Sequence, residues 1–323
     1  MTQPVPVHIL LPCLNEERSI EPMVAALSQT FAGDQSFRVT AVFIDDGSHD
    51  NTWREIERVR RGDWAVGVGG IRLDHHQGKG VAQAIGIRAL TAEPGMVVLM
   101  DSDGQHDPSP LPAALHACEA SKLPQVARRT DYQRRRTSML GTLGLSLFAG
   151  LTGVRFDPTL GEYLVLPHRT VRLLAGNPQL GITPLVPLVQ ASVTRVETFS
   201  APVLERSDGS RSTRWTKGQL WHKAILMLLA NPWAMLPRLA LTIAVTIALL
   251  GTYGLAVGIA SVLNGTFMGV GSILVVTVLI FSVLAGLQMM TLGLLVVMFR
   301  TGLHTGMPPA VDVETLDWSA GRA

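Results

Sequence analysis

Charged residues are missing from a long stretch near the carboxyl end of the sequence. Residues 239–299 include no Asp, Glu, Lys or Arg, although the chain of 323 residues has 27 Lys and Arg and 25 Asp and Glu. Solvated surfaces are rich in charged side chains, so this composition argues against an ordinary soluble domain there. The break marks a domain boundary, with a large polar domain before it and an apolar appendage after it.

Two apolar runs fill the uncharged stretch. They cover residues 239–262 and 271–299, and only the uncharged segment LNGTFMGV separates them. Each run exceeds the roughly 20 residues that cross a bilayer core. The alternative is a pair of helices buried within a large protein. We expect a transmembrane hairpin over residues 238–299, in contact with a lipid bilayer.

Basic residues flank the two runs on their outer sides, and the segment between the runs has none. Those nearest the runs are Arg238 before the first and Arg300 after the second. Because positive residues stay on the cytoplasmic side, both ends of the hairpin are expected there, together with the tail 300–323. This predicts a multi-pass protein of the cell (inner or plasma) membrane with cytoplasmic termini.

The segment before the first run, residues 215–237, combines tryptophans with basic residues. Trp215, Trp221 and Trp233 are spaced along it, with an apolar stripe between them. Such a helix can lie in the plane of the membrane interface. We expect an amphipathic interfacial helix; an ordinary packing helix is the alternative.

Cysteine is scarce and the net charge is small. Cys13 and Cys118 stand far apart without a CxxC or His-rich context, which excludes a disulfide framework and a cysteine zinc site. We expect two buried thiols. A net charge of +2 does not suggest nucleic-acid binding. The amino terminus has no basic segment ahead of its short apolar run, unlike a secretory signal, so we expect residues 1–214 in the cytoplasm.

Residues 1–214 alternate between strand-like and helix-like patterns. This alternation predicts an α/β fold with a mainly parallel sheet and helices on both faces. The expected strands are 7–14, 38–48, 65–73 and 95–100, and the expected helices are 19–31, 50–61, 78–92 and 109–121. In such sheets, ligands bind at the carboxyl ends of the strands.

Acidic residues stand at the carboxyl ends of three of the expected strands and are predicted to share that edge. They are Glu16, Asp46 and the pair Asp101 and Asp103. Hard divalent cations prefer oxygen ligands, and magnesium often takes one or two carboxylates beside phosphate and water. Asp101 and Asp103 fit that pattern, and Gln105 offers a neutral oxygen. The alternative is structural, because acids also terminate strands and cap helices.

Four motifs in order resemble the family 2 glycosyltransferases, and among them the dolichol- and polyprenyl-phosphate sugar synthases. They are LLPCLNEE, FIDDGSHDNT, QGKGVAQAIGIRAL and MDSDGQHDP, within a stretch from Val5 to about Arg211. The resemblance implies a GT-A-type nucleotide-diphosphosugar transferase domain. It also implies Mg²⁺ or Mn²⁺ at the nucleotide diphosphate, held by Asp101 and Asp103 as the catalytic pair. The nucleotide-sugar-binding residues it implies are Pro12, Leu14, Glu16, Ile44, Asp46, Lys79, Ser102 and Arg129. A two-span hairpin is similar to that of bacterial members.

The later motifs agree with the family less closely. In VARRTDY we align Arg129 with the family's arginine, with Arg128 as the alternative. In DPTLGEY, Asp157 and Gly161 agree, whereas Glu162 and Tyr163 replace an aromatic–arginine pair. These departures bear on the sugar and the acceptor more than on the nucleotide.

The resemblance implies transfer of a hexose from a nucleotide-diphosphate sugar, of the GDP-mannose or UDP-glucose type, to undecaprenyl or dolichyl monophosphate with inversion. A phosphate monoester is mostly dianionic at neutral pH, since its second pKa is about 6, so the acceptor needs a cationic site more than a general base. The expected acceptor-phosphate residues are Arg128, Arg134, Arg135, Arg136, Ser138, Arg206 and Arg211. A solvated basic loop, or one that touches lipid headgroups, is the alternative.

Two other functions remain open. A processive polysaccharide synthase shares the nucleotide-binding half, but the segment RSTRW lacks the glutamine of the Gln-x-x-Arg-Trp motif of such enzymes. Two spans are also few for lining a polymer tunnel. A non-catalytic membrane scaffold with the same fold is the other possibility.

Overall fold

The structure, a computed structural model, describes residues 3–129, 157, 159–202, 204, 252, 263, 283, 284, 287 and 313–316. The chain divides into two compact units. The first comprises Met1–Ala149, Val154–Ala230 and Ala310–Ala323, and the second comprises Gly150–Gly153 and Asn231–Pro309. The predicted interfacial helix and most of the two predicted spans lie outside the described residues. Among the residues that are described, no helix is long and apolar enough to cross a membrane.

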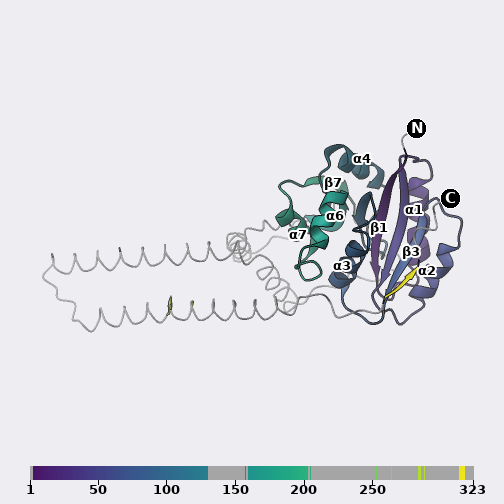
Figure 1. Cartoon of the computed structure of the whole chain (residues 1–323), viewed down its shortest axis with the longest axis horizontal. Helices are drawn as coiled ribbons and strands as arrows, with labels where there is room; N and C mark the ends of the chain where they lie inside the picture. Colours follow the sequence, from purple (N-terminus) through teal and green to yellow (C-terminus); the bar gives the residue numbers. More distant parts are fainter. Residues whose placement is uncertain are drawn as a thin grey trace. The chain divides into compact units, whose positions relative to one another are not determined.

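The first unit is built on a mixed sheet with the strand order β7-β5-β6-β4-β1-β2-β3-β8 (Figure 1). The strands are β1 (Val5–Cys13), β2 (Phe37–Asp45), β3 (Gly67–Leu73), β4 (Met96–Leu99), β5 (Gln125–Arg129), β6 (Leu160–Leu166), β7 (Glu197–Ala201) and β8 (Val313–Leu316). The central strands β4, β1, β2 and β3 are parallel, as predicted. Antiparallel pairing joins β6 to β4 and β5, and β8 to β3. Sequence analysis did not predict these antiparallel strands.

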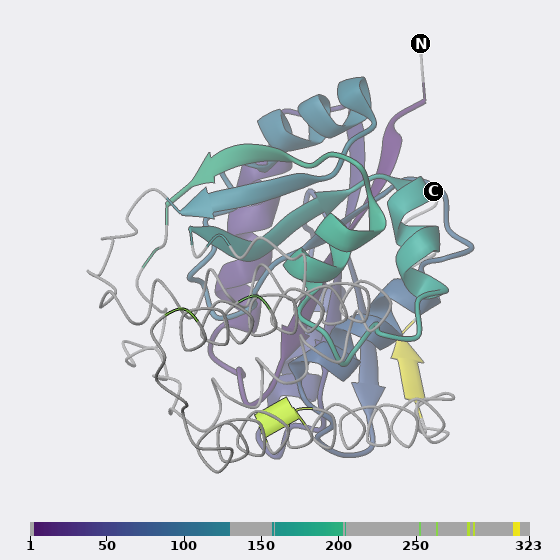
Figure 2. The same cartoon turned by 90° about the vertical axis from the view of Figure 1, so that its left-hand side faces the viewer.

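Helices cover both faces of the sheet, which confirms the predicted α/β architecture. On one face lie α1 (Ile20–Phe31), α2 (Thr52–Arg60) and α4 (Leu111–Ser121), and on the other lie α3 (Lys79–Ala89), α6 (His168–Ala175) and α7 (Leu185–Ser192). Figure 2 shows the helices and the sheet from a second direction. Successive residues of β1 point to opposite faces: Ile9 and Leu11 join the first core, and Leu10 joins the second. Because both faces are buried, the strand reads as a continuous apolar run.

Strand β8 brings a segment from near the end of the chain back to the sheet. Its register pairs Gly70 of β3 with Leu316 and Leu73 with Val313. The described residues on either side of the long apolar stretch therefore belong to one sheet. Cys13 and Cys118 are free and buried, as predicted.

Candidate functional site

The carboxyl ends of β1, β2 and β4 meet at one edge of the sheet, because these strands are parallel. A cavity of about 220 Å³ lies there. Of the residues predicted to bind the nucleotide sugar or the metal, those that line it are Pro12, Leu14, Glu16, Asp46, Lys79, Asp101, Ser102 and Asp103. Cys13 and His76 also line it, and sequence analysis missed both. Cys13 is the last residue of a strand, and that position could have indicated that it lines the site. His76 lies in a loop and belongs to no motif, so the sequence offered no signal for it.

Ile44, Gln105 and the two predicted site arginines that the structure describes, Arg128 and Arg129, are not among the residues that line this cavity. Ile44 is fully buried in the core, beside α3. The backbone N–H of Gln105 donates to Asp103 Oδ1 at 3.0 Å, and its carbonyl accepts from Leu204 N at 2.9 Å. Neither Ile44 nor Gln105 is among the described residues that line the cavity.

The loop after β1 is fastened to the loop after β2. Asn15, in the left-handed region at φ 56°, donates its N–H to Ser48 Oγ at 2.9 Å and accepts the N–H of His49 at its side-chain oxygen at 3.0 Å. The next residue, Glu16, donates its N–H to Thr52 Oγ1 at 2.9 Å. These contacts fix one wall of the cavity with backbone groups.

Asp46 holds the turn that carries Lys79. Its carboxylate accepts the N–H of Gln77 at 2.7 Å and of Gly78 at 2.9 Å, and lies 2.8 Å from His76 Nδ1. Hydrogen bonds to an ionised carboxylate are stronger than those between neutral groups. Gly78 has φ +97°, a conformation that favours glycine. The sequence motif GKG thus places its lysine at the start of α3 by binding to the end of β2.

Lys79 lies between two carboxylates. Its Nζ is 2.5 Å from Asp101 Oδ1 and 3.0 Å from Glu162 Oε2. Partial desolvation lowers the pKa of Lys79, but the charges of Asp101 and Glu162 outweigh it and raise the pKa above the usual range. Desolvation likewise raises the pKa of Asp101, and Lys79 outweighs it so that the pKa falls. Lys79 and Asp101 are therefore both charged near neutral pH.

The turn after β4 is braced by His106 and Tyr163. The N–H of Asp101 donates to His106 Nδ1 at 2.9 Å, and Ser102 Oγ donates to the Pro12 carbonyl at 2.9 Å. The His106 ring stacks on Tyr163 at 4.9 Å, and the Tyr163 hydroxyl donates to the Asp107 carbonyl at 3.0 Å. Burial lowers the pKa of His106, which favours the neutral ring. Because the Asp101 N–H donates to Nδ1, the proton of the neutral ring lies on Nε2. Tyr163, one of the departures from the family pattern, thus supports the acidic motif.

The donors at this edge suit a divalent cation that arrives with a diphosphate. Asp101 and Asp103 line one cavity and offer hard oxygen ligands. The part of the chain that the structure describes holds no group of three or more His, Cys, Asp or Glu arranged as a metal site. A sparse pair of carboxylates nevertheless fits magnesium, which completes its shell with phosphate oxygens and water. The two carboxylates are thus compatible with a metal site that is completed by phosphate and water.

Arg128 and Arg129, the two predicted site arginines that the structure describes, differ in their surroundings. Arg128 pairs with Asp157 at 3.3 Å and donates to Thr159 Oγ1 at 2.9 Å. The Arg129 side chain lies close to Gly161: a Cβ atom added to Gly161 would lie 3.4 Å from Arg129 Nε. The charge of Arg129 also helps to lower the pKa of Asp101. Arg129 is thus the nearer in electrostatic terms to the acidic motif. The other predicted acceptor residues, Arg134, Arg135, Arg136, Ser138, Arg206 and Arg211, lie outside the described residues.

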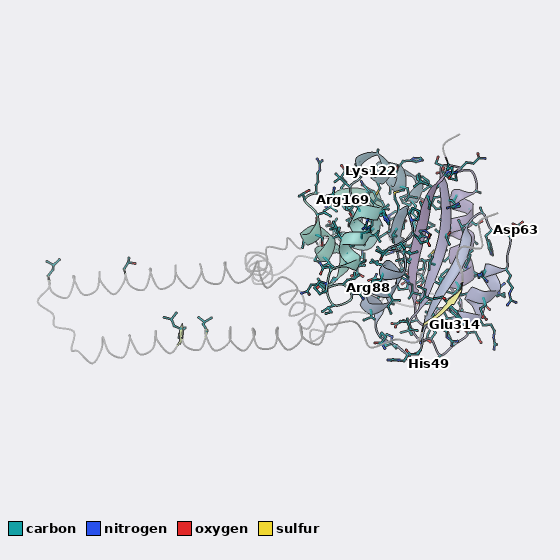
Figure 3. All side chains as sticks on the ribbon, in the orientation of Figure 1. His49, Asp63, Arg88, Lys122, Arg169 and Glu314 are labelled. Atoms are coloured by element: carbon teal, nitrogen blue, oxygen red, sulfur yellow. The ribbon has the colours of Figure 1, made fainter. Side chains whose placement is uncertain are left out.

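A second cavity of about 500 Å³ lies at the same ends of β2 and β3. Its lining comprises Gly47, Ser48, His49, Arg72, Leu73, Asp74 and Glu314. Figure 3 shows His49 and Glu314 at this end of the sheet. Strand β8 therefore contributes a side chain next to the loop that Asp46 begins.

Comparison with known proteins relates the segment that carries this site to a known family. Residues 8–155 match the family model of glycosyl transferase family 2. This segment of the chain is similar to the family 2 glycosyltransferases. The match supports the sequence-based prediction of a glycosyltransferase, and the matched segment contains every residue that lines the first cavity.

Two curated relatives are similar over parts of the chain. An uncharacterized glycosyltransferase, YkoT of Bacillus subtilis (strain 168), is 26% identical over 62% of this chain and 62% of its own length. The dodecaprenyl-phosphate galacturonate synthase of Rhizobium johnstonii (strain DSM 114642 / LMG 32736 / 3841) is 28% identical over 38% of this chain and 35% of its own length. The chain thus spans less than two thirds of either relative.

Among solved structures, the chain is similar to the mannosyltransferase PcManGT from Pyrobaculum calidifontis, solved in complex with GDP-Man and Mn²⁺. The identity is 20% and the TM-score 0.45, over 83% of this chain and 84% of that one.

Proposed function

We propose that the protein is a membrane-bound, inverting glycosyltransferase. It moves a hexose from a nucleotide-diphosphate sugar, of the GDP-mannose or UDP-glucose type, to a polyprenyl monophosphate such as undecaprenyl or dolichyl phosphate. The observation that carries the proposal is the cavity in which Asp101, Asp103 and Lys79 meet, within the segment that is similar to the family 2 glycosyltransferases. The carboxylates and the lysine suit a metal-bound diphosphate.

The donor half of the proposal rests on charge. Asp101 and Asp103 would hold Mg²⁺ or Mn²⁺, which when bound neutralises charge on the leaving diphosphate as a Lewis acid. Lys79, kept protonated by its two carboxylate neighbours, supplies a positive charge from the protein itself. Asp46 fixes the turn that carries this lysine, and His106 fixes the backbone that carries Asp101.

The acceptor half rests on the chemistry of a phosphate nucleophile. A dianionic phosphate needs positive charge to approach a donor that is itself anionic. The family resemblance assigns Arg129 to the nucleotide sugar, and Arg128 is among the residues expected at the acceptor phosphate. Because the charge of Arg129 acts on Asp101 and a guanidinium can engage two phosphate oxygens, we assign Arg129 to the acceptor phosphate as well. The printed name of the Rhizobium relative, a dodecaprenyl-phosphate galacturonate synthase, supports a lipid phosphate as the acceptor.

The proposed membrane location rests on the apolar runs and on strand β8. Three apolar residues within or beside the runs are described and have solvent-exposed side chains. Their exposed fractions are 80% for Leu263, 59% for Val283 and 41% for Leu287. Exposed leucine and valine suit contact with lipid. Because β8 pairs with β3 of the same unit as β1, a chain that enters the bilayer after residue 204 must return to the side from which it left. This fits a two-span hairpin with both ends in the cytoplasm.

Transfer is tested by incubating the purified protein with radiolabelled GDP-mannose or UDP-glucose, a short polyprenyl phosphate and Mg²⁺ or Mn²⁺, followed by organic extraction. The proposal predicts label in the lipid phase that depends on both the acceptor and the metal. Label in a water-soluble polymer would instead indicate a processive synthase. Nucleotide binding without any product, over a panel of sugar donors, would indicate a scaffold.

A further inference from the structure

Glu162 is the second carboxylate at Lys79, and it stands where the resembling family has an aromatic residue. Its Oε2 lies 3.0 Å from Lys79 Nζ, while Asp101 Oδ1 lies 2.5 Å from the same atom. The exposed fraction of the side chain is 30% for Glu162, 42% for Lys79 and 28% for Asp101. The ammonium is thus shared by two acids at the border of the cavity.

The sheet itself brings Glu162 to this place. Strand β6 is antiparallel to β4, with Val97 opposite Leu166 and Leu99 opposite Leu164. Continuing this register by two residues sets Glu162 opposite Asp101. The start of β6 therefore lies at the carboxyl end of β4, and the carboxylate is held by strand pairing and not by a loop.

The sharing of Lys79 matters because its ammonium occupies an oxygen of Asp101 that a divalent cation would use. A lysine with one acidic partner would compete fully for that oxygen. A second partner on the far side lets the ammonium remain near the cavity while it gives up Asp101. The charge of Glu162 also adds to the negative charge around the cation.

We propose that Glu162 is a positioning residue that draws Lys79 away from Asp101, so that Asp101 can serve a divalent cation while the lysine stays beside the diphosphate. This inference rests on the proposed function. Its consequence is that Glu162 has opposite effects on the affinity for the cation and on the affinity for the diphosphate. It strengthens binding of the cation and weakens binding of a nucleoside diphosphate in the absence of metal.

The test uses the full-length protein in detergent and measures binding, not turnover. Mn²⁺ is titrated alone by electron paramagnetic resonance of the free ion, and UDP and GDP are titrated without metal by calorimetry. For Glu162→Gln we expect Mn²⁺ affinity to fall by about tenfold and affinity for the preferred nucleoside diphosphate to rise severalfold, as expected for the loss of one charge at short range in a partly desolvated site. Glu162→Asp, which keeps the charge, should retain most of the wild-type Mn²⁺ affinity.

Glu119→Gln is the matched control. Glu119 pairs with Lys122 on the surface at α4, so the change also removes one carboxylate from a glutamate–lysine pair, and it should leave both affinities unchanged. Lys79→Met should shrink the effect of Glu162→Gln on Mn²⁺, because the competing ammonium is gone. Two outcomes would overturn the role of Glu162. One is that Glu162→Gln shifts the Mn²⁺ affinity and the nucleoside diphosphate affinity equally in the same direction. The other is that it shifts neither affinity, although the wild-type protein binds both ligands. Failure of the wild-type protein to bind either ligand would overturn the proposed function itself.

Discussion

At the scale of single residues, the acidic motif after β4 has two parts with different surroundings. Asp101 is paired with Lys79, whereas Asp103 accepts a backbone N–H from Gln105 within its own turn. We expect Asp103→Asn to abolish metal-dependent binding of the nucleotide and transfer of the sugar, because it removes one ligand charge while the amide keeps the shape. Calorimetry of nucleotide with Mn²⁺, together with far-UV circular dichroism, measures this. Normal metal-dependent binding in the variant would contradict the assignment of Asp103.

A second residue-scale prediction concerns His8 of β1. The side chain is 8% exposed, its Nδ1 has no hydrogen-bond partner among the described residues, and burial lowers its pKa from the ordinary 6.5. The fold therefore prefers the neutral ring. Its contribution to stability is complete above pH 6.5 and falls as the pH drops below that value, by at most about 1.4 kcal/mol for each pH unit.

The measurement for His8 is the melting temperature of the domain between pH 7.5 and 5.5, followed by tryptophan fluorescence. His8→Gln keeps a polar group but cannot gain a proton in this range. Its melting temperature should fall less steeply with acidification than that of the wild type. Parallel curves would show that His8 takes no part in the acid response.

Much of the site could be predicted at this scale, since the residues that line the cavity follow strands whose apolar runs are evident. The motifs around Glu16, Asp46, Lys79 and Asp101 are local, and each stands at the end of one element. The partnership of Lys79 with Glu162 could not be predicted, because it depends on the register between β4 and β6. The contact of Ile44 with the nucleotide stays a prediction from its motif; alternation along β2 directs its side chain into the core.

At the scale of elements, the loops after β2 and β3 are packed so closely that glycine is required. Gly47 has φ +73°, and a Cβ atom there would lie 2.5 Å from the backbone carbon of His75. Gly47→Ala should cost roughly 1–3 kcal/mol of stability from the backbone conformation and should weaken nucleotide binding, since the same loops place Asp46 and Lys79.

Gly33→Ala is the control for this change. A Cβ atom at Gly33 meets no atom within 4 Å, so the free energy of unfolding should change by about 0.5 kcal/mol or less. Chemical denaturation of both variants gives the comparison. If the Gly47→Ala protein is as stable as the Gly33→Ala protein, the two loops can move apart enough to accept a Cβ atom at position 47, and the prediction is wrong.

The central strands and the first four helices were predictable because apolar periodicity is a local signal. Met96–Leu99 reads as a buried strand, and Leu111–Ser121 as a helix after a proline-rich turn. Strands β5 to β8 escaped prediction for the opposite reason. Val313–Leu316 spans 4 residues and becomes a strand through its partner β3, so its pattern alone carried too little information.

At the scale of the whole molecule, the two apolar runs and strand β8 together predict the topology. We expect single cysteines at positions 265 and 318, in a background without Cys13 and Cys118, to behave oppositely in intact cells or spheroplasts. An impermeant maleimide should label position 265 from outside and leave position 318 unlabelled until the membrane is permeabilised. Labelling of position 318 from outside would contradict the hairpin with cytoplasmic ends.

The central claim is that Asp101 and Asp103 hold a divalent cation together with the diphosphate of the donor. The most direct measurement is a crystal structure of the protein with Mn²⁺ and its preferred nucleoside diphosphate, using the anomalous signal of manganese. We predict an anomalous peak bridging the carboxylates of Asp101 or Asp103 and the diphosphate oxygens, with Lys79 turned toward Glu162 or the diphosphate. A nucleotide bound in the cavity with no manganese peak beside these carboxylates, and with Lys79 still on Asp101, would contradict the account.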